Sequence, residues 1–201
     1  SAIGFDSGAD DLETGAGGGS MVFIKKLTAS SSGTLSFVDG ASSVVLDDTY
    51  KEYVFTYNNI HAATDNVEFQ FNVSIDGGSN YNVAKTTTYF RTYNYEDDSD
   101  AALGYRTPRD LAQGTGFQAL TEGQGNGNDE SCSGQLTIFN PSDTTFVKHF
   151  IARNSMYGRT DYEMDIYVAG YANTTSAVDA VQFKMSSGNI DAGTITLYGI
   201  T

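Results

Sequence analysis

The sequence predicts an all-β protein built as an antiparallel β-sandwich. Its composition favours strands, with 13 Tyr and 12 Phe but only 2 Pro, because aromatic and β-branched side chains suit the half-buried surface of a sheet. Apolar and polar residues alternate with a period of two in several segments, as they do when one face of a strand is buried. Turn signals separate these segments at the spacing of hairpins, which is typical of sandwiches.

Residues 1–20 are predicted to form a flexible N-terminal arm. The segment is poor in large apolar residues and ends in a glycine-rich run, Gly15 to Gly19, a composition typical of flexible linkers. Ile3, Phe5 and Leu12 are its large apolar side chains, and we predict that they dock on a neighbouring subunit. The chain therefore divides into an arm, 1–20, and a single sandwich domain, 21–201.

The clearest strand covers residues 67–75, where apolar residues alternate with Glu68, Gln70, Asn72 and Ser74. This pattern predicts one buried and one solvated face. The following Asp-Gly-Gly at 76–78 predicts a tight hairpin turn, with 80–93 as the returning strand. A short helix is expected at 109–113. In all, ten to twelve strands are expected, the others lying near 22–24, 35–37, 44–46, 53–57, 136–138, 146–156, 164–168, 181–185 and 195–197.

Charge and cysteine content exclude several kinds of partner and site. The 25 acidic and 11 basic residues give a net charge of −14, which repels nucleic-acid phosphates and anionic lipid surfaces. No apolar run approaches the ~20 residues of a membrane span, and no secretory signal is recognisable. Cys132 is the single cysteine, so neither an intrachain disulfide nor a cysteine-based metal site is expected. We predict no nucleic-acid partner and no membrane association.

Catalytic residues are not expected. His61 and His149 are the two histidines, and neither lies in a pattern that suggests a Ser-His-Asp site. Paired carboxylates could serve glycan hydrolysis, but the acids at 96–100 form a charged loop. Those at 161, 163 and 165 alternate along a strand and are expected on its solvated face. The sequence therefore predicts a non-enzymatic protein without catalytic residues or a cofactor.

One loop offers oxygen ligands for a cation. Asn126, Asn128, Asp129 and Glu130 place four hard donors within five residues, although their spacing does not match an EF-hand. They are a weak candidate for a structural calcium site, and the alternative is a loop that is only solvated.

Two long polar loops, 94–114 and 121–134, are the candidates for recognition, because loops on a rigid scaffold often carry binding residues. Tyrosine suits contacts with sugars and proteins, since its ring is apolar and its hydroxyl is polar. The candidate recognition residues are Tyr95, Tyr105, Arg106, Arg109, Asn126 and Asn128.

Several stretches are distinctive: FNPS at 139–142, TTFVKHF at 144–150, AGY at 169–171 and DGGSNY at 76–81. The chain closes with VQFKMSSGNI at 181–190 and GTITLYGI at 193–200. Together these segments, spread over 21–201, resemble a family of virion structural proteins of marine and freshwater tailed phages. The resemblance implies a jelly-roll-like sandwich on the outside of a particle, and it brings no catalytic motif.

This resemblance and the polar loops favour an exposed appendage module, such as a tail-fibre or receptor-adhesion protein of an extracellular virion. The alternatives are a capsid decoration or cement protein, and a filament subunit that lends its arm as a strand; a glycan depolymerase ranks last. Expected partners are other virion proteins, copies of the same chain in a homo-oligomer, and a host-surface glycan or protein. Position in the particle and oligomeric state stay open.

Overall fold

The computed structural model describes residues 20–201. Ile3, Phe5 and Leu12, the predicted anchors of the arm, lie outside the described residues, so the docking arm stays a prediction. Between residues 20 and 201 the chain forms strands and no helix. No segment of this part is therefore a helix long and apolar enough to cross a membrane.

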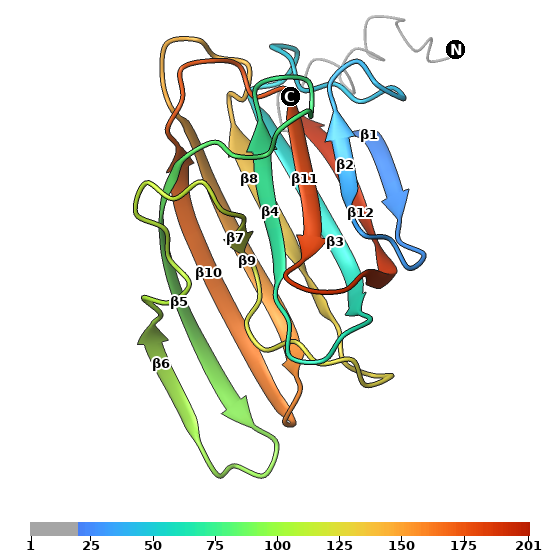
Figure 1. Ribbon diagram of the computed structural model, residues 1–201, viewed down its shortest axis with the longest axis vertical. Coiled ribbons are helices and arrows are strands. Elements are labelled where there is room, and N and C mark those ends of the chain that lie inside the picture. Colours follow the sequence, from blue (N-terminus) through green and yellow to red (C-terminus); the bar gives the residue numbers. More distant parts are fainter. Residues whose placement is uncertain (1–19) are drawn as a thin grey trace, which may run out of the picture.

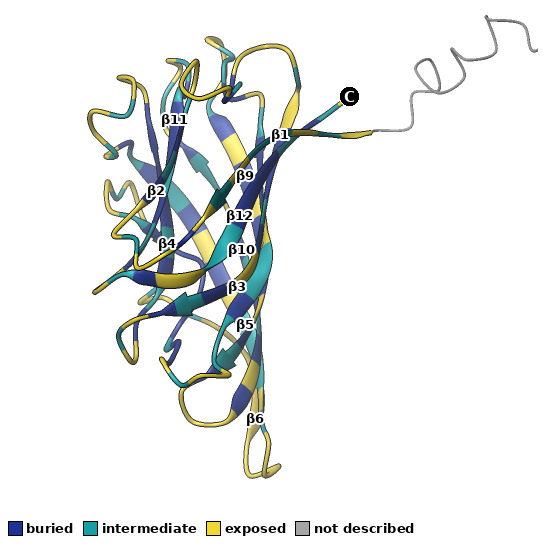
Figure 2. Ribbon diagram, turned by 90° about the vertical axis from the view of Figure 1, so that its right-hand side faces the viewer, coloured by how far each residue is buried: buried dark blue, intermediate teal, exposed yellow. Residues whose placement is uncertain are grey.

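The predicted all-β sandwich is confirmed, because two antiparallel sheets pack face to face (Figures 1 and 2). The larger sheet has eight strands in the order β1-β12-β3-β8-β9-β10-β5-β6, and the smaller has four in the order β2-β11-β4-β7. The narrower jelly-roll description stays a prediction. The strands are β1 (Met21–Thr28), β2 (Leu35–Val38), β3 (Glu52–Ala62), β4 (Phe69–Ser74), β5 (Lys85–Tyr95), β6 (Ala101–Tyr105), β7 (Gln118–Ala119), β8 (Cys132–Phe139), β9 (Lys148–Gly158), β10 (Tyr162–Ala172), β11 (Ala180–Met185) and β12 (Ile190–Ile200).

Aromatic rings fill the space between the sheets, with Phe183 of β11 at their centre. Its ring stacks on Phe69 at 5.6 Å between centroids and lies 5.5 Å from Phe55 of the opposite sheet. Phe37, Tyr57 and Phe71 surround it at 6.3–6.4 Å. Such ring pairs add stabilisation beyond the area that they bury, so this cluster contributes to holding the two sheets together.

The predicted hairpin after residue 75 is wrong. Gly77 and Gly78 do adopt positive φ, as a tight turn requires, but the chain then crosses between the sheets. β4 pairs with β11 and β7, whereas β5 pairs with β10 and β6. Turn chemistry is local, and the pairing of β5 is decided by strands far along the chain.

The prediction that one face of β4 is solvated is also wrong in part, because Asn72 and Ser74 on that face are fully buried. The Asn72 amide donates to the carbonyls of Tyr81 and Thr115, so the segments that cross over this face satisfy it. The helix expected at 109–113 is absent: these residues form turns and bends. Leu111 instead bonds to β5: its carbonyl accepts a hydrogen bond from the Thr87 backbone amide, and its own amide donates to the Thr87 hydroxyl.

The larger sheet extends beyond the smaller one. We call the uncovered part the overhang: the inward face of β6 and of the ends of β5 and β10 at Tyr95 and Tyr162. Figure 1 shows these strand ends continuing past β7, the last strand of the smaller sheet. Two loop segments cover the gap in place of a strand, and we call the second of them, residues 120–124, the covering loop. Residues 106–114 run along the edge of β5, and residues 120–124 run along Val67 and Phe69. The candidate site lies between this loop and the overhang.

Candidate functional site

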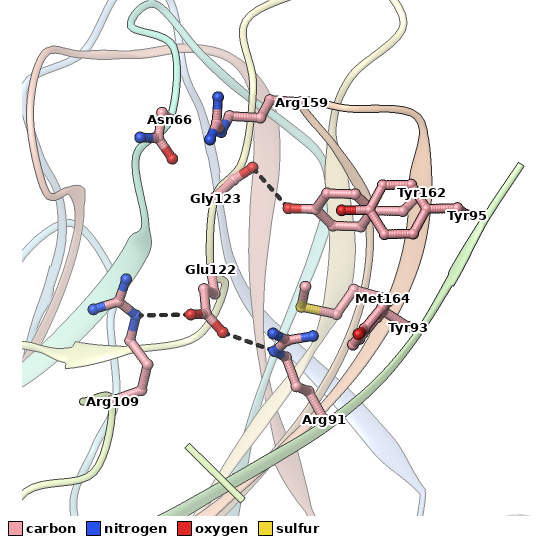
Figure 3. A pocket seen from close by; sticks show the side chains of 10 residues that line it. All are labelled: Asn66, Arg91, Tyr93, Tyr95, Arg109, Glu122, Gly123, Arg159, Tyr162 and Met164. Atoms are coloured by element: carbon pink, nitrogen blue, oxygen red, sulfur yellow. Dashed lines mark hydrogen bonds and ion pairs between the residues drawn. The ribbon is translucent and has the colours of Figure 1, made fainter. Parts of the chain in front are cut away.

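A polar cleft of about 250 Å³ opens between the overhang and the covering loop (Figure 3). Two cross-strand pairs of β5 and β10, Tyr95 with Tyr162 and Tyr93 with Met164, supply its sheet wall together with Arg91 of β5. Strand partners directly opposite one another point to the same face, so these side chains share the inner face. The lining residues are Asn66, Arg91, Tyr93, Tyr95, Arg109, Glu122, Gly123, Arg159, Tyr162 and Met164.

Arginines gather around Glu122, whose side chain comes from the covering loop. Arg106 donates to both oxygens of this carboxylate, from Nε at 3.1 and 3.0 Å and also from Nη2. Arg91 Nε lies 2.9 Å from Glu122 Oε2, and Arg109 Nε lies 3.7 Å from Oε1. Arg109 reaches a second carboxylate, that of Glu68, at 2.8 Å. One buried acid thus ties β5 and the stretch between β6 and β7 to the loop.

The electrostatics of the cluster keep Glu122 ionised. Burial alone would raise its pKa, but the hydrogen bonds from Arg106 and the charges of Arg106, Arg91 and Arg109 outweigh burial and lower the pKa. A carboxylate acting as a general acid at neutral pH needs a raised pKa instead. Behind the cluster, the buried hydroxyl of Tyr89 has no hydrogen-bond partner among the described residues, and the charge of Glu122 adds to burial in raising the pKa of Tyr89.

Arg159 differs from the other three arginines of the cluster. Its backbone amide donates to Gly123 O at 3.3 Å, and its side chain lines the cleft from the turn between β9 and β10. Within residues 20–201 its guanidinium forms no ion pair and no side-chain hydrogen bond. Figure 3 places it beside Asn66, at the opposite end of the cleft from Arg91.

Tyrosines line the sheet wall of the cleft beside Arg91. The Tyr95 ring meets Tyr162 edge-on at 5.3 Å and Tyr93 at 5.9 Å, and Arg91 lies over the Tyr93 ring at 4.6 Å. The Tyr162 hydroxyl donates to Gly123 O at 3.4 Å, and the Tyr93 hydroxyl donates to Asp100 at 2.7 Å. Gly123 of the covering loop has φ +68, and a Cβ there would approach the Tyr162 hydroxyl to 2.9 Å. Only glycine therefore fits at this position without strain.

The structure places the predicted recognition residues in three places. Tyr95 and Arg109 line the cleft, and Arg106 binds Glu122 beside it. Tyr105 pairs with Phe90 across β6 and β5, on the outer face, and its hydroxyl donates to Asp110. Asn126 and Asn128 are exposed further along the 121–134 loop, beyond Glu122 and Gly123, and do not line the cleft.

Sequence reasoning missed Arg91, Tyr93, Glu122, Arg159 and Tyr162 as site residues. A signal was present: the chain has only five arginines, and three of them, Arg91, Arg106 and Arg109, fall within 19 residues. In a chain of net charge −14, such clustering of the scarce cation points to a local function.

The calcium candidate gains no ligand geometry. No three side chains of His, Cys, Asp or Glu converge as a metal-binding group within residues 20–201. The Glu130 carboxylate accepts a hydrogen bond from the backbone amide of Gly127 in its own loop, while the Asn126 amide lies at 3.5 Å from Ala63 O. A structural calcium ion at Asn126, Asn128, Asp129 and Glu130 stays a prediction from the sequence.

The outer face of the larger sheet carries a second group of exposed side chains. Phe90 and Tyr167 stack in parallel at 4.8 Å, and Arg153 lies over Tyr167 at 5.0 Å while binding Asp165 at 2.9 Å. Ile151 of neighbouring β9 is half exposed. The acids at 163 and 165 lie on this face, bonded to Ser155 and Arg153, as their alternation along the strand indicates.

Comparisons with protein-family models, with curated proteins and with solved structures found no match.

Proposed function

We propose that this protein is a non-enzymatic structural protein of a tailed-phage virion that acts in an exposed appendage as a receptor-binding module. The observation that carries the proposal is the cleft at the overhang. Four of the chain's five arginines gather there, with three tyrosines, on an otherwise acidic protein. A concave site with a few convergent polar groups is where a ligand is expected to bind, and the resemblance to phage virion proteins favours a ligand on a host surface.

The chemistry of the cleft supports binding rather than catalysis. Its central acid, Glu122, has a lowered pKa and is held by arginines, which suits neither a general acid nor a free nucleophile. His61 lies away from this cleft, with Nδ1 3.4 Å from Asp191 and Nε2 2.9 Å from Gly127 O. Both nitrogens are therefore engaged, and neither faces a nucleophilic side chain.

The first test is to locate and count the chain in intact particles by cryo-electron microscopy. We expect a few to tens of copies at a tail or fibre, and the isolated protein should compete with particles for adsorption to host cells. Hundreds of copies on the head lattice, or adsorption that excess protein leaves unchanged, would overturn the proposal. Deleting the loop 94–114 would not test the role of the cleft in adsorption, because this segment contains β6 and hydrogen-bonds along β5. Point substitutions of cleft residues are the better test.

A second candidate function is assembly, as a decoration protein or filament subunit, and the edges of the larger sheet favour it. Among the described residues, no strand pairs with the outer edge of β1 or of β6, and all five residues of β6 are exposed. Unpaired edges accept an added strand readily. The same particle count separates the two functions, because decoration requires copies throughout the lattice.

A further inference from the structure

The charge balance of the cleft leaves room for an anion. Arg91, Arg106, Arg109 and Arg159 bring four guanidinium groups, while Glu122 and Glu68 bring two carboxylates, so these six side chains carry an excess of two positive charges. Three of the arginines are committed to these two acids. Arg159 is the guanidinium without an ion pair among the described residues, and it lines the cleft.

The remaining walls suit a sugar ring. Tyr95 presents a partly exposed ring beside Tyr93 and Tyr162, and such rings offer an apolar surface with a polar tip. Asn66 is exposed next to Arg159 (Figure 3), and its amide can both donate and accept hydrogen bonds from hydroxyl groups. A volume of about 250 Å³ falls just below the range of roughly 300–1,000 Å³ for drug-sized ligands, as expected for one sugar unit of a longer chain.

We propose that the cleft binds a carboxylate-bearing sugar unit of a surface polysaccharide, with its carboxylate on Arg159 and its ring against Tyr95. This inference rests on the proposed attachment function and adds the class of ligand. A guanidinium matches a carboxylate with two parallel hydrogen bonds. Among the described residues Arg159 is the one guanidinium of the cleft that no acid already binds, so it is the group free to pair with the carboxylate of a uronic or sialic acid.

The direct test is a glycan array, probed with the full-length protein, that carries oligosaccharides ending in glucuronic, galacturonic or sialic acid. Matched neutral and sulfated oligosaccharides, and the methyl esters of the acidic ones, stand beside them. We expect binding to the free acids, with loss of binding to the neutral sugars and to the esters. Equal binding to the neutral sugars or to the esters would overturn the proposal, and binding confined to sulfated sugars would replace carboxylate by sulfate.

Two arginine substitutions make a matched pair for the same array. Arg159→Ala should weaken binding to the acidic sugars by about ten- to a hundredfold, the loss expected for a charge-assisted hydrogen-bond pair. Arg159→Lys keeps the charge but not the two-pronged geometry, and it should fall between. Arg153→Ala removes the same charge from the outer face, where Arg153 binds Asp165, and should bind like the wild type. Equal losses at 153 and 159 would overturn the assignment of the site.

Failure of the ligand class and failure of the function remain separable. If the protein competes for adsorption but binds no acidic sugar on the array, the attachment function stands and the carboxylated ligand is wrong. If it binds acidic sugars but does not compete for adsorption, the ligand is right and the attachment function is wrong.

Discussion

The inner faces of β5 and β10 differ between their two ends, although the strands are continuous. Where the smaller sheet covers them, they carry buried Tyr89, Ile166 and Val168. On the overhang, the same alternation presents Arg91, Tyr93 and Tyr95. The facing partner explains the difference: one end meets a sheet of aromatic side chains, the other a polar loop. The candidate site therefore lies where the larger sheet extends past its partner.

The largest expected effect comes from removing the ring at the centre of the aromatic cluster between the two sheets. Phe183→Ala leaves five aromatic neighbours without their common contact. It should lower the free energy of unfolding by about 3–5 kcal/mol, as large-to-small changes in cores do. Urea unfolding followed by circular dichroism measures this, while sugar binding by the folded fraction should be unchanged. A loss below about 1 kcal/mol would mean that the ring cluster does not hold the sheets together.

On the overhang the corresponding contact is ionic. Glu122→Gln leaves three arginines facing one another around an uncharged amide, and we expect a loss of about 2–3 kcal/mol. This is below the roughly 3–5 kcal/mol for fully buried pairs, because the Arg106 side chain is 36% exposed. The control is Glu163→Gln on the outer face of β10. Among the described residues this carboxylate accepts a hydrogen bond from Ser155, and the change should cost less than about 0.5 kcal/mol. Similar losses for both variants would contradict the central role of Glu122.

The same pair of variants gives a pH dependence. The pKa of Glu122 is lowered in the folded protein, so its contribution to stability is complete above the ordinary carboxyl pKa and is lost as pH falls through the lowered value. The wild type should therefore lose its advantage over Glu122→Gln only below about pH 4. Urea midpoints measured from neutral to acidic pH check this. An advantage that stays constant into strong acid would show that the charge of Glu122 is not what stabilises the overhang.

The sequence predicted the sandwich and the outer-face position of the acids of β10 because both depend on local alternation. Its failures are non-local. The turn at 76–78 was recognisable, but the partner of β5 depends on β10, more than sixty residues later. Asn72 looked solvated because alternation within its own strand does not show that two later segments, near Tyr81 and Thr115, cross over its side chain. On β5 both faces carry aromatics, Tyr89 inward and Phe90 outward, so alternation could not decide which way Arg91 points. The cleft therefore could not be assembled from the sequence.

The covered end also buries a cation, and it does so without an acid. Lys85 of β5 is fully buried, with Nζ donating to Val83 O at 2.8 Å and to the Asn72 side chain. Burial lowers its pKa to about 7, whereas an unfolded lysine keeps its ordinary pKa near ~10.4. Between these values the unfolded chain binds a proton that the folded one lacks, so Lys85 makes stability rise with pH in this window.

The smallest expected effect follows from that slope, which Lys85→Met should remove. From about pH 7 to about pH 9, the wild type should gain about 1–2 kcal/mol relative to the variant. A full proton of difference between the folded and unfolded chains would give ~1.4 kcal/mol for each pH unit. We expect a smaller slope because the two hydrogen bonds to Lys85 favour its charged form. Comparing the two proteins cancels the ionisation of other groups, and urea unfolding at each pH supplies the difference. Lys184→Met, which removes a cation held over the Phe117 ring rather than enclosed in the core, should leave the slope unchanged. Parallel curves for the wild type and Lys85→Met would mean that Lys85 stays charged at neutral pH. The covered end would then stabilise a buried cation as fully as the overhang does, with carbonyl and amide oxygens in place of Glu122.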